Sequence, residues 1–119
     1  MEFFRQLPIK LEETSLRETF TLTALPQWCE EIYAVKVDEQ AEQAEMDCLW
    51  GRYAIRREPI RGGVRFMLPT CPNALQFTLT TGFPPAPEAV MLHCTINRPP
   101  EVVDPDFAES LAMFMQAWC

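Results

Sequence analysis

Four segments in the second half of the chain alternate between apolar and polar residues, with the period of two that is typical of half-buried β-strands. They cover residues 48–57, 64–68, 75–81 and 90–96. Each connection between them contains proline, glycine or both and has hairpin length, so consecutive strands should reverse direction. The pattern therefore predicts an antiparallel meander.

The last segment has the pattern of an amphipathic helix. Asp104 is a good N-cap residue, and Pro105 occupies the first helical position. One apolar stripe follows at helical spacing, made of Phe107, Leu111, Phe114, Met115 and Trp118. This stripe needs an apolar surface to cover, and we expect one face of the sheet to supply it.

These elements predict a single α+β domain over residues 1–119, in which an antiparallel meander sheet of five to six strands packs against the C-terminal helix. The alternative is a small β-barrel capped by the same helix, as in PH-like folds. A chain of 119 residues with 48% hydrophobic residues is long and apolar enough to bury a core of its own.

The region around residues 18–37 also alternates. Phe20, Leu22 and Ala24 are separated by threonines, which predicts a half-buried strand that Pro26 ends. The β-branched residues of segment 32–37 predict a further strand, and a short helix over residues 27–34 is the alternative.

Two other segments carry weaker patterns. Residues 1–17 show no sustained period, although their first apolar residues are compatible with one helical turn before Pro8. Residues 38–47 hold five acidic side chains among glutamine and alanine, and we interpret them as a solvated loop or a short helix.

Charge and composition exclude several classes of protein. The net charge of -7 argues against a general nucleic-acid binder, which needs a positive surface to neutralise phosphates. Charged residues interrupt the N-terminus, so no signal peptide is expected, and five prolines interrupt the longest uncharged run, residues 66–87. We therefore expect a cytoplasmic protein without a membrane segment.

Cysteine and histidine indicate no metal, cofactor or disulfide framework. The five cysteines have no paired spacing, and His93 is the single histidine. His93 and Cys94 are neighbours on a predicted strand, so their side chains should point to opposite faces and cannot form a dyad. Cys71, in a proline turn, is expected to be the most exposed thiol. No catalytic set is evident, which favours a protein that is not an enzyme.

Half of the ten basic residues lie on one predicted hairpin: Arg52, Arg56, Arg57, Arg61 and Arg65. The preceding segment, residues 30–47, holds seven acids and one lysine. An arginine-lined face can bind carboxylate or phosphate groups with paired hydrogen bonds, so these residues are candidates for anion or acidic-partner binding. The alternative is that they neutralise the acidic segment, within one chain or across a dimer.

A second apolar surface is the other candidate for binding. Trp50 has the opposite strand parity from Tyr53 and Ile55, which predicts that it lies on the sheet face away from the helix. With Met67 and Met91 it would form a surface for a partner, a second copy or a ligand. The alternative is a second core beneath the N-terminal segment.

Two segments resemble known families of binding proteins. The final strand and the helix over residues 104–118, in a small acidic chain, resemble the ends of type III secretion chaperones. That family also has a helix in mid-chain, for which the loop over residues 82–88 leaves no room. Phe77, Leu79 and the prolines that follow resemble a strand and loop of RWD and ubiquitin-conjugating domains. No cysteine follows Pro100 in the position of a conjugating nucleophile, so both resemblances imply protein binding.

The leading hypothesis is a non-enzymatic protein-binding or adaptor module that self-associates, using Trp50, the two methionines and the arginine hairpin. The alternatives are a small-molecule or anion-binding protein, or minor enzyme, with a pocket between sheet and helix, and an acidic binding protein similar to a secretion chaperone.

Overall fold

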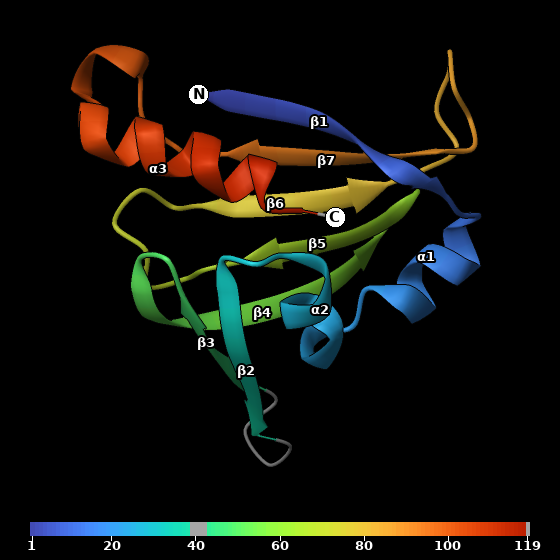
Figure 1. Cartoon of the computed structure of the whole chain (residues 1–119), viewed down its shortest axis with the longest axis horizontal. Helices are drawn as coiled ribbons and strands as arrows, with labels where there is room; N and C mark the ends of the chain where they lie inside the picture. The colour runs from blue at the N-terminus through green and yellow to red at the C-terminus, as the bar shows by residue number, and fades with distance from the viewer. Residues whose placement is uncertain (39–42, 119) are drawn as a thin grey trace.

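The computed structural model of the protein describes residues 1–38 and 43–118. Its main feature is one seven-stranded antiparallel sheet in the order β1-β7-β6-β5-β4-β3-β2 (Figure 1). The strands are β1 (Glu2–Lys10), β2 (Ile32–Asp38), β3 (Gln43–Cys48), β4 (Gly51–Ile60), β5 (Gly63–Met67), β6 (Gln76–Thr80) and β7 (Ala89–Thr95). The predicted α+β fold with its meander is confirmed, and the sheet is not closed into a barrel.

The four predicted strands of the second half correspond to β4, β5, β6 and β7, and each pairs with the next. Strand β4 is shared between two hairpins. Its residues 51–55 pair with β3, and residues 56–60 pair with β5. Pro59 lies in the second half of β4, where β3 no longer pairs with it. Its missing N–H therefore interrupts no hydrogen bonds between β3 and β4.

The predicted helix is α3 (Pro105–Gln116). The Asp104 carboxylate accepts a hydrogen bond of 2.8 Å from the backbone N–H of Asp106, as expected of an N-cap. At the other end, the Arg5 guanidinium donates to the carbonyls of Met115, Gln116 and Trp118. A cation therefore binds the carbonyls that end the helix, where the helix dipole is negative.

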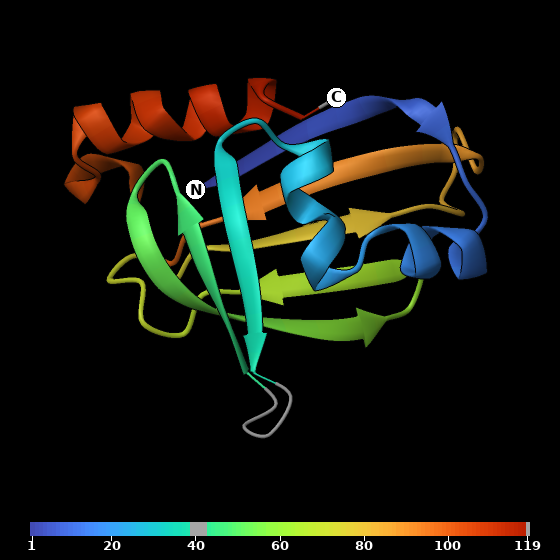
Figure 2. The same cartoon turned by 60° about the horizontal axis from the view of Figure 1, so that its bottom comes forward.

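The core lies between α3 and the inner face of the sheet. Phe77 is at its centre, with its ring centroid 5.1 Å from Phe66, 5.5 Å from Phe114 and 5.7 Å from Trp118. All four side chains are fully buried. Figures 1 and 2 show α3 and the two N-terminal helices on the same, concave side of the curved sheet.

The predicted strand around residues 18–24 is wrong. The segment forms α1 (Glu13–Thr19), the short 3-10 helix η1 (Leu22–Ala24) and α2 (Leu25–Trp28). Leu16, Phe20 and Leu25 are completely buried, so the apolar residues follow a helical spacing that begins before the alternating stretch. The hydroxyl of Thr19 donates a 2.7 Å hydrogen bond to the Ser15 carbonyl, a bond that a threonine makes readily inside a helix.

Two segments interpreted as irregular are strands. Residues 2–10 form β1, which pairs with β7 at the far edge of the sheet and contains an irregularity between Leu7 and Lys10. Residues 43–48 form β3, on which Ala44, Met46 and Cys48 are buried. The loop or helix interpretation of the acidic segment is therefore wrong for β3, and its residues 39–42 lie outside the described residues. Segment 32–37 is a strand, β2, as predicted.

Candidate functional site

No described helix covers the convex side of the sheet. Along β5, β6 and β7, buried side chains alternate with partly exposed ones, so the buried set faces the helices and the other set faces outward. We call this second set, together with its neighbours on β1 and β4, the outer face. It comprises Glu2, Phe4, Gln6, Met91, His93, Thr95, Gln76, Thr78, Thr80, Arg65, Met67, Arg56 and Glu58.

Phe4 is the most exposed large apolar residue of the described part of the chain, at 63%. Its ring stacks on His93, with centroids 4.2 Å apart and planes within 4°. The Nε2 atom of His93 lies 3.2 Å from Oε1 of Glu2, a contact that is an ion pair when the imidazole is protonated. One ring face of Phe4 is thus held by its neighbour, and the other is open to solvent.

Met91 and Met67 lie on the outer face, as the sequence predicted, and both are partly buried. Met91 pairs with Gln6 of β1, which makes it a diagonal neighbour of Phe4 within reach of that ring. Met67 pairs with Arg56 on one side and with Gln76 on the other. The outer face therefore has one apolar group on β1 and β7, at an edge of the sheet, and another on the central strand β5, with threonines between them.

Trp50 is not on the outer face, which corrects the sequence prediction. Its ring lies 5.6 Å from Phe107 and 5.1 Å from Phe114, and its Nε1–H donates a 2.7 Å hydrogen bond to the hydroxyl of Ser110. Trp50 therefore packs against α3. The prediction assumed that side chains alternate between the two faces of a strand from residue 48 onward. That alternation does not apply to Trp50, because β4 begins at Gly51 and Trp50 belongs to the turn that joins β3 to β4.

The five arginines of the hairpin do not form one surface. Arg57 points to the helix side, where its Nε donates a 3.0 Å hydrogen bond to the Phe20 carbonyl and a second nitrogen donates one of 2.6 Å to the Arg17 carbonyl. Burial, and secondarily the charge of Arg17, lowers the pKa of Arg57. This guanidinium ties the end of α1 to β4 and is not available to a ligand.

Two further arginines are paired with acids. Arg52 donates a 2.8 Å hydrogen bond to Asp47 and lies 4.0 Å from Glu45, which is the neutralisation of the acidic segment that one hypothesis expected. The hydrogen bond to Asp47 raises the pKa of Arg52. Arg65 lies 3.4 Å from Glu58, its cross-strand neighbour.

Arg56 and Arg61 are exposed. Among residues 1–38 and 43–118, no carboxylate lies within 4.0 Å of either guanidinium. Arg61 lies in the tight turn between β4 and β5. Arg56 borders a cavity.

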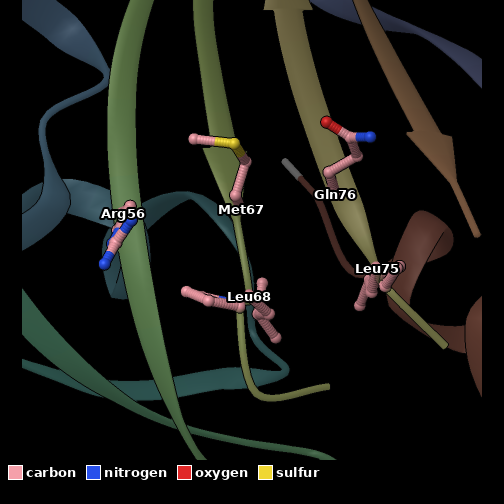
Figure 3. Close-up of a pocket in the computed structure, with 7 residues that line it drawn as sticks. Arg56, Met67, Leu68, Leu75 and Gln76 are labelled. Carbon is pink, nitrogen blue, oxygen red and sulfur yellow. The ribbon is translucent and has the colours of Figure 1, made fainter. Parts of the chain in front are cut away.

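This cavity lies beside the middle of β4, where β5 ends and β6 begins (Figure 3). It has a volume of about 220 Å³ and is lined by Arg56, Met67, Leu68, Pro69, Ala74, Leu75 and Gln76. The sequence predicted a pocket between sheet and helix, whereas this one opens at the end of the sheet. Two candidate residues that are far apart in the sequence, Arg56 and Met67, meet there because they are cross-strand partners.

The cysteines and the histidine bring together no reactive group. His93 and Cys94 point to opposite faces, as predicted: His93 is on the outer face, while Cys94 is completely buried and its burial raises its pKa to about 12. Cys71 is the most exposed of the four described cysteines. No three histidine, cysteine or acidic side chains of the described residues lie close enough to hold a metal ion.

Phe4 and Gln76 are outer-face residues that the sequence interpretation missed. Phe4 was overlooked because residues 1–17 were not recognised as containing a strand.

None of the helices in the described part of the chain is long and apolar enough to span a membrane.

Comparison with known proteins identifies the fold and not the family. No family model matches the chain, and no curated relative matches it either. An uncharacterized protein from Bacillus thuringiensis is similar in structure, with a TM-score of 0.65, 12% identity, and coverage of 98% of this chain and 93% of that one. The protein XoxI from Bacillus cereus is similar too, with a TM-score of 0.67, 13% identity, and coverage of 98% and 89%. At such identities the similarity shows the fold alone.

Proposed function

We propose that this protein is a non-enzymatic protein-binding module that self-associates through its outer face. The observation that carries this proposal is the position of Phe4, a 63% exposed aromatic residue on a sheet face that no described helix covers. Contiguous exposed apolar patches mark interaction surfaces, and aromatic residues supply much of the binding energy in them. On this face Phe4 and its diagonal neighbour Met91 supply the apolar group.

The charges of the outer face support a second copy as the partner. The chain as a whole carries a charge of -7, which opposes association of two copies through most of their surface. The outer face carries two carboxylates, Glu2 and Glu58, and two guanidinium groups, Arg56 and Arg65, so these charges balance. Two outer faces can therefore approach each other with little repulsion between like charges.

The arrangement also suits a symmetric pair. Most homo-oligomers are two-fold dimers, in which the same residues of both copies meet around the symmetry axis. Phe4 and Met91 are diagonal neighbours at one end of the sheet, so an axis close to them would bring four apolar side chains together. The threonines of β6 and β7 would form the polar rim that such interfaces have.

Sedimentation equilibrium over a range of concentrations tests the proposal with a matched pair of variants. Phe4→Gln removes the apolar ring from the outer face, and Met113→Gln makes the same kind of change on the exposed side of α3, where Met113 is 51% exposed. Neither variant changes the net charge. The expected result is a dimer for the unmodified protein and for Met113→Gln, with a dissociation constant at least tenfold weaker for Phe4→Gln.

Equal dimerisation of the two variants would show that the outer face is not the interface. A monomer at all concentrations for the unmodified protein would contradict self-association altogether. Far-UV circular dichroism serves as the control for folding, because substitutions of exposed residues change stability by only about 0.5 kcal/mol.

A further inference from the structure

The cavity beside Arg56 exists because two strands end where β4 continues. Strand β5 stops at Met67, and Pro69 follows two residues later without an N–H to extend the ladder. Residues 51–55 of β4 therefore have β3 as their partner on one edge and no pairing with β5 on the other. The space between β4 and the loop over residues 68–75 is the cavity.

Backbone hydrogen bonds hold this loop in a fixed shape. The N–H of Leu68 donates to the Leu75 carbonyl at 3.2 Å, and the N–H of Cys71 donates back to the Leu68 carbonyl at 3.1 Å. At the outer side of the loop, the N–H of Asn97 donates to the Asn73 carbonyl at 2.9 Å. The wall of the cavity is thus tied to itself and to the chain beyond β7, so it is formed before any ligand arrives.

One residue of this wall has an unfavourable backbone conformation. Ala74 has a φ of 50°, in the left-handed region that glycine adopts readily and alanine does not. Its N–H donates a 3.0 Å hydrogen bond to the Cys71 carbonyl, which closes the turn. Backbone strain of this kind is found most often where a loop is shaped for binding.

The lining combines one cation with apolar groups. Five of the seven lining residues are apolar, and Arg56 and Gln76 supply the polar atoms. On the outer face, Arg56 and Gln76 flank Met67 on neighbouring strands, so their side chains border the apolar part of the cavity from two sides (Figure 3). Arg56 has no carboxylate within 4.0 Å in the described part of the chain.

We propose that this cavity binds a carboxylate carried on a compact, branched apolar group. The Arg56 guanidinium would bind the carboxylate with paired hydrogen bonds, and the Gln76 amide would donate another. The apolar group would lie against Met67 and the leucines. A volume of about 220 Å³ is below the roughly 300–1,000 Å³ of pockets for drug-sized ligands, which limits the apolar group to about the size of one side chain.

This proposal does not depend on self-association. A carboxylate on a branched apolar group has two sources, a free short-chain acid and the C-terminal residue of another protein chain. Both present the same chemistry to Arg56, and the probes below distinguish them.

Titration with isocaproate, followed by amide chemical shifts of the labelled protein, tests the site. The expected dissociation constant is on the order of 1 mM, as for a small ligand with one charged contact. The shifts should be confined to the residues that line the cavity. Isocaproamide has the same shape without the charge. It should bind about tenfold more weakly, because a hydrogen bond between two charged groups contributes roughly this factor more to affinity than one to a neutral amide.

The matched variants are Arg56→Gln and Arg61→Gln. Each removes one exposed arginine of the same hairpin, and only Arg56 borders the cavity. Arg56→Gln should weaken isocaproate binding about tenfold, whereas Arg61→Gln should leave it unchanged within a factor of two. Equal loss in both variants would mean that general electrostatic attraction, and not the site, holds the acid.

An acetylated tripeptide ending in leucine, with a free or an amidated C-terminus, identifies the source. Tighter binding of the free peptide than of isocaproate supports the C-terminus of a partner chain, and tighter binding of isocaproate supports a free acid. The proposal is overturned if neither probe shifts the lining residues at about 20 mM, roughly twentyfold above the expected constant, or if amide and acid bind equally.

Discussion

Trp50 provides the sharpest test of how the C-terminal helix is attached. We expect Trp50→Ala to destabilise the protein, because the indole ring contacts two aromatic residues of α3 and donates a hydrogen bond of 2.7 Å to Ser110. If Trp50 belonged instead to an exposed binding surface, the same substitution would change stability very little.

The expected magnitude follows from these contacts. Replacing a fully buried tryptophan by alanine costs about 3–5 kcal/mol, and Trp50 is only partly buried, so the lower end, about 3 kcal/mol, applies. Trp50→Phe keeps an aromatic ring between the helix residues but loses the hydrogen bond to Ser110, worth about 1 kcal/mol, and part of the packed ring surface, so its cost should lie between about 1 and 3 kcal/mol. For a domain of this size, each kcal/mol corresponds to roughly 4 °C in Tm.

Urea unfolding followed by far-UV circular dichroism measures these differences without depending on the fluorescence of the residue that is removed. Met113→Ala is the control on the same helix, since Met113 is 51% exposed, and it should change stability by less than about 0.5 kcal/mol. A loss of less than about 1 kcal/mol in Trp50→Ala would show that this residue does not help to hold α3 against the sheet.

Two further predictions concern the sheet. A Cβ on Gly63 would lie 1.9 Å from the carbonyl oxygen of Leu79, so Gly63→Ala should lower the free energy of unfolding in urea by more than about 3 kcal/mol. Gly82→Ala is the control: no atom lies within 4 Å of the added Cβ, and its φ of 87° alone should cost about 1 kcal/mol. Burial raises the pKa of Cys94 from 9.0 to about 12. The unfolded thiol therefore loses its proton first as the pH rises above 9.0, and the unfolding free energy should fall between pH 9.0 and about 12. Cys94 should account for about 1 kcal/mol of this fall by pH 10. Burial also raises the pKa of Cys48, so Cys94→Ala should still lose stability above pH 9.0, but by about 1 kcal/mol less than the unmodified protein. Parallel pH profiles of the two proteins would contradict the prediction.

Strands β4 to β7 and α3 could be predicted from the sequence because each has a local signal that its surroundings reinforce. Buried and exposed residues alternate along β6 and β7 without interruption. The helix has an N-cap, a proline at its start and an apolar stripe, and the sheet offers that stripe a surface to cover.

The first half of the chain could not be predicted in the same way because its local pattern fits more than one structure. Phe20 and the threonines around it alternate as in a strand, yet Leu16 and Phe20 also lie one helical turn apart. Only the position of the core decides between the two, and the core is built from distant segments. In β3 the buried residue Ala44 is small and Glu45 and Asp47 are charged, so the strand looks like a solvated segment.

The site predictions succeeded or failed for similar reasons. The placement of Met67 and Met91 followed from strand parity, and parity holds inside a strand. It does not hold for Trp50, which lies in a turn, and a shift of the strand start by three residues was enough to reverse the prediction. The separate roles of the five arginines depend on which acids and carbonyls lie nearby in space, which spacing along the chain does not reveal.

We propose that the outer face is the surface through which this protein binds another protein, a second copy of itself. Amide chemical shifts of the unmodified protein, recorded at increasing concentration, test it most directly. We expect the amide shifts of β1 and β7 to change with concentration, with those of Phe4, Gln6 and Met91 among the largest changes, while the shifts of the exposed side of α3 stay constant. Changes confined to α3 or to β2 and β3, or none at any concentration, would contradict it.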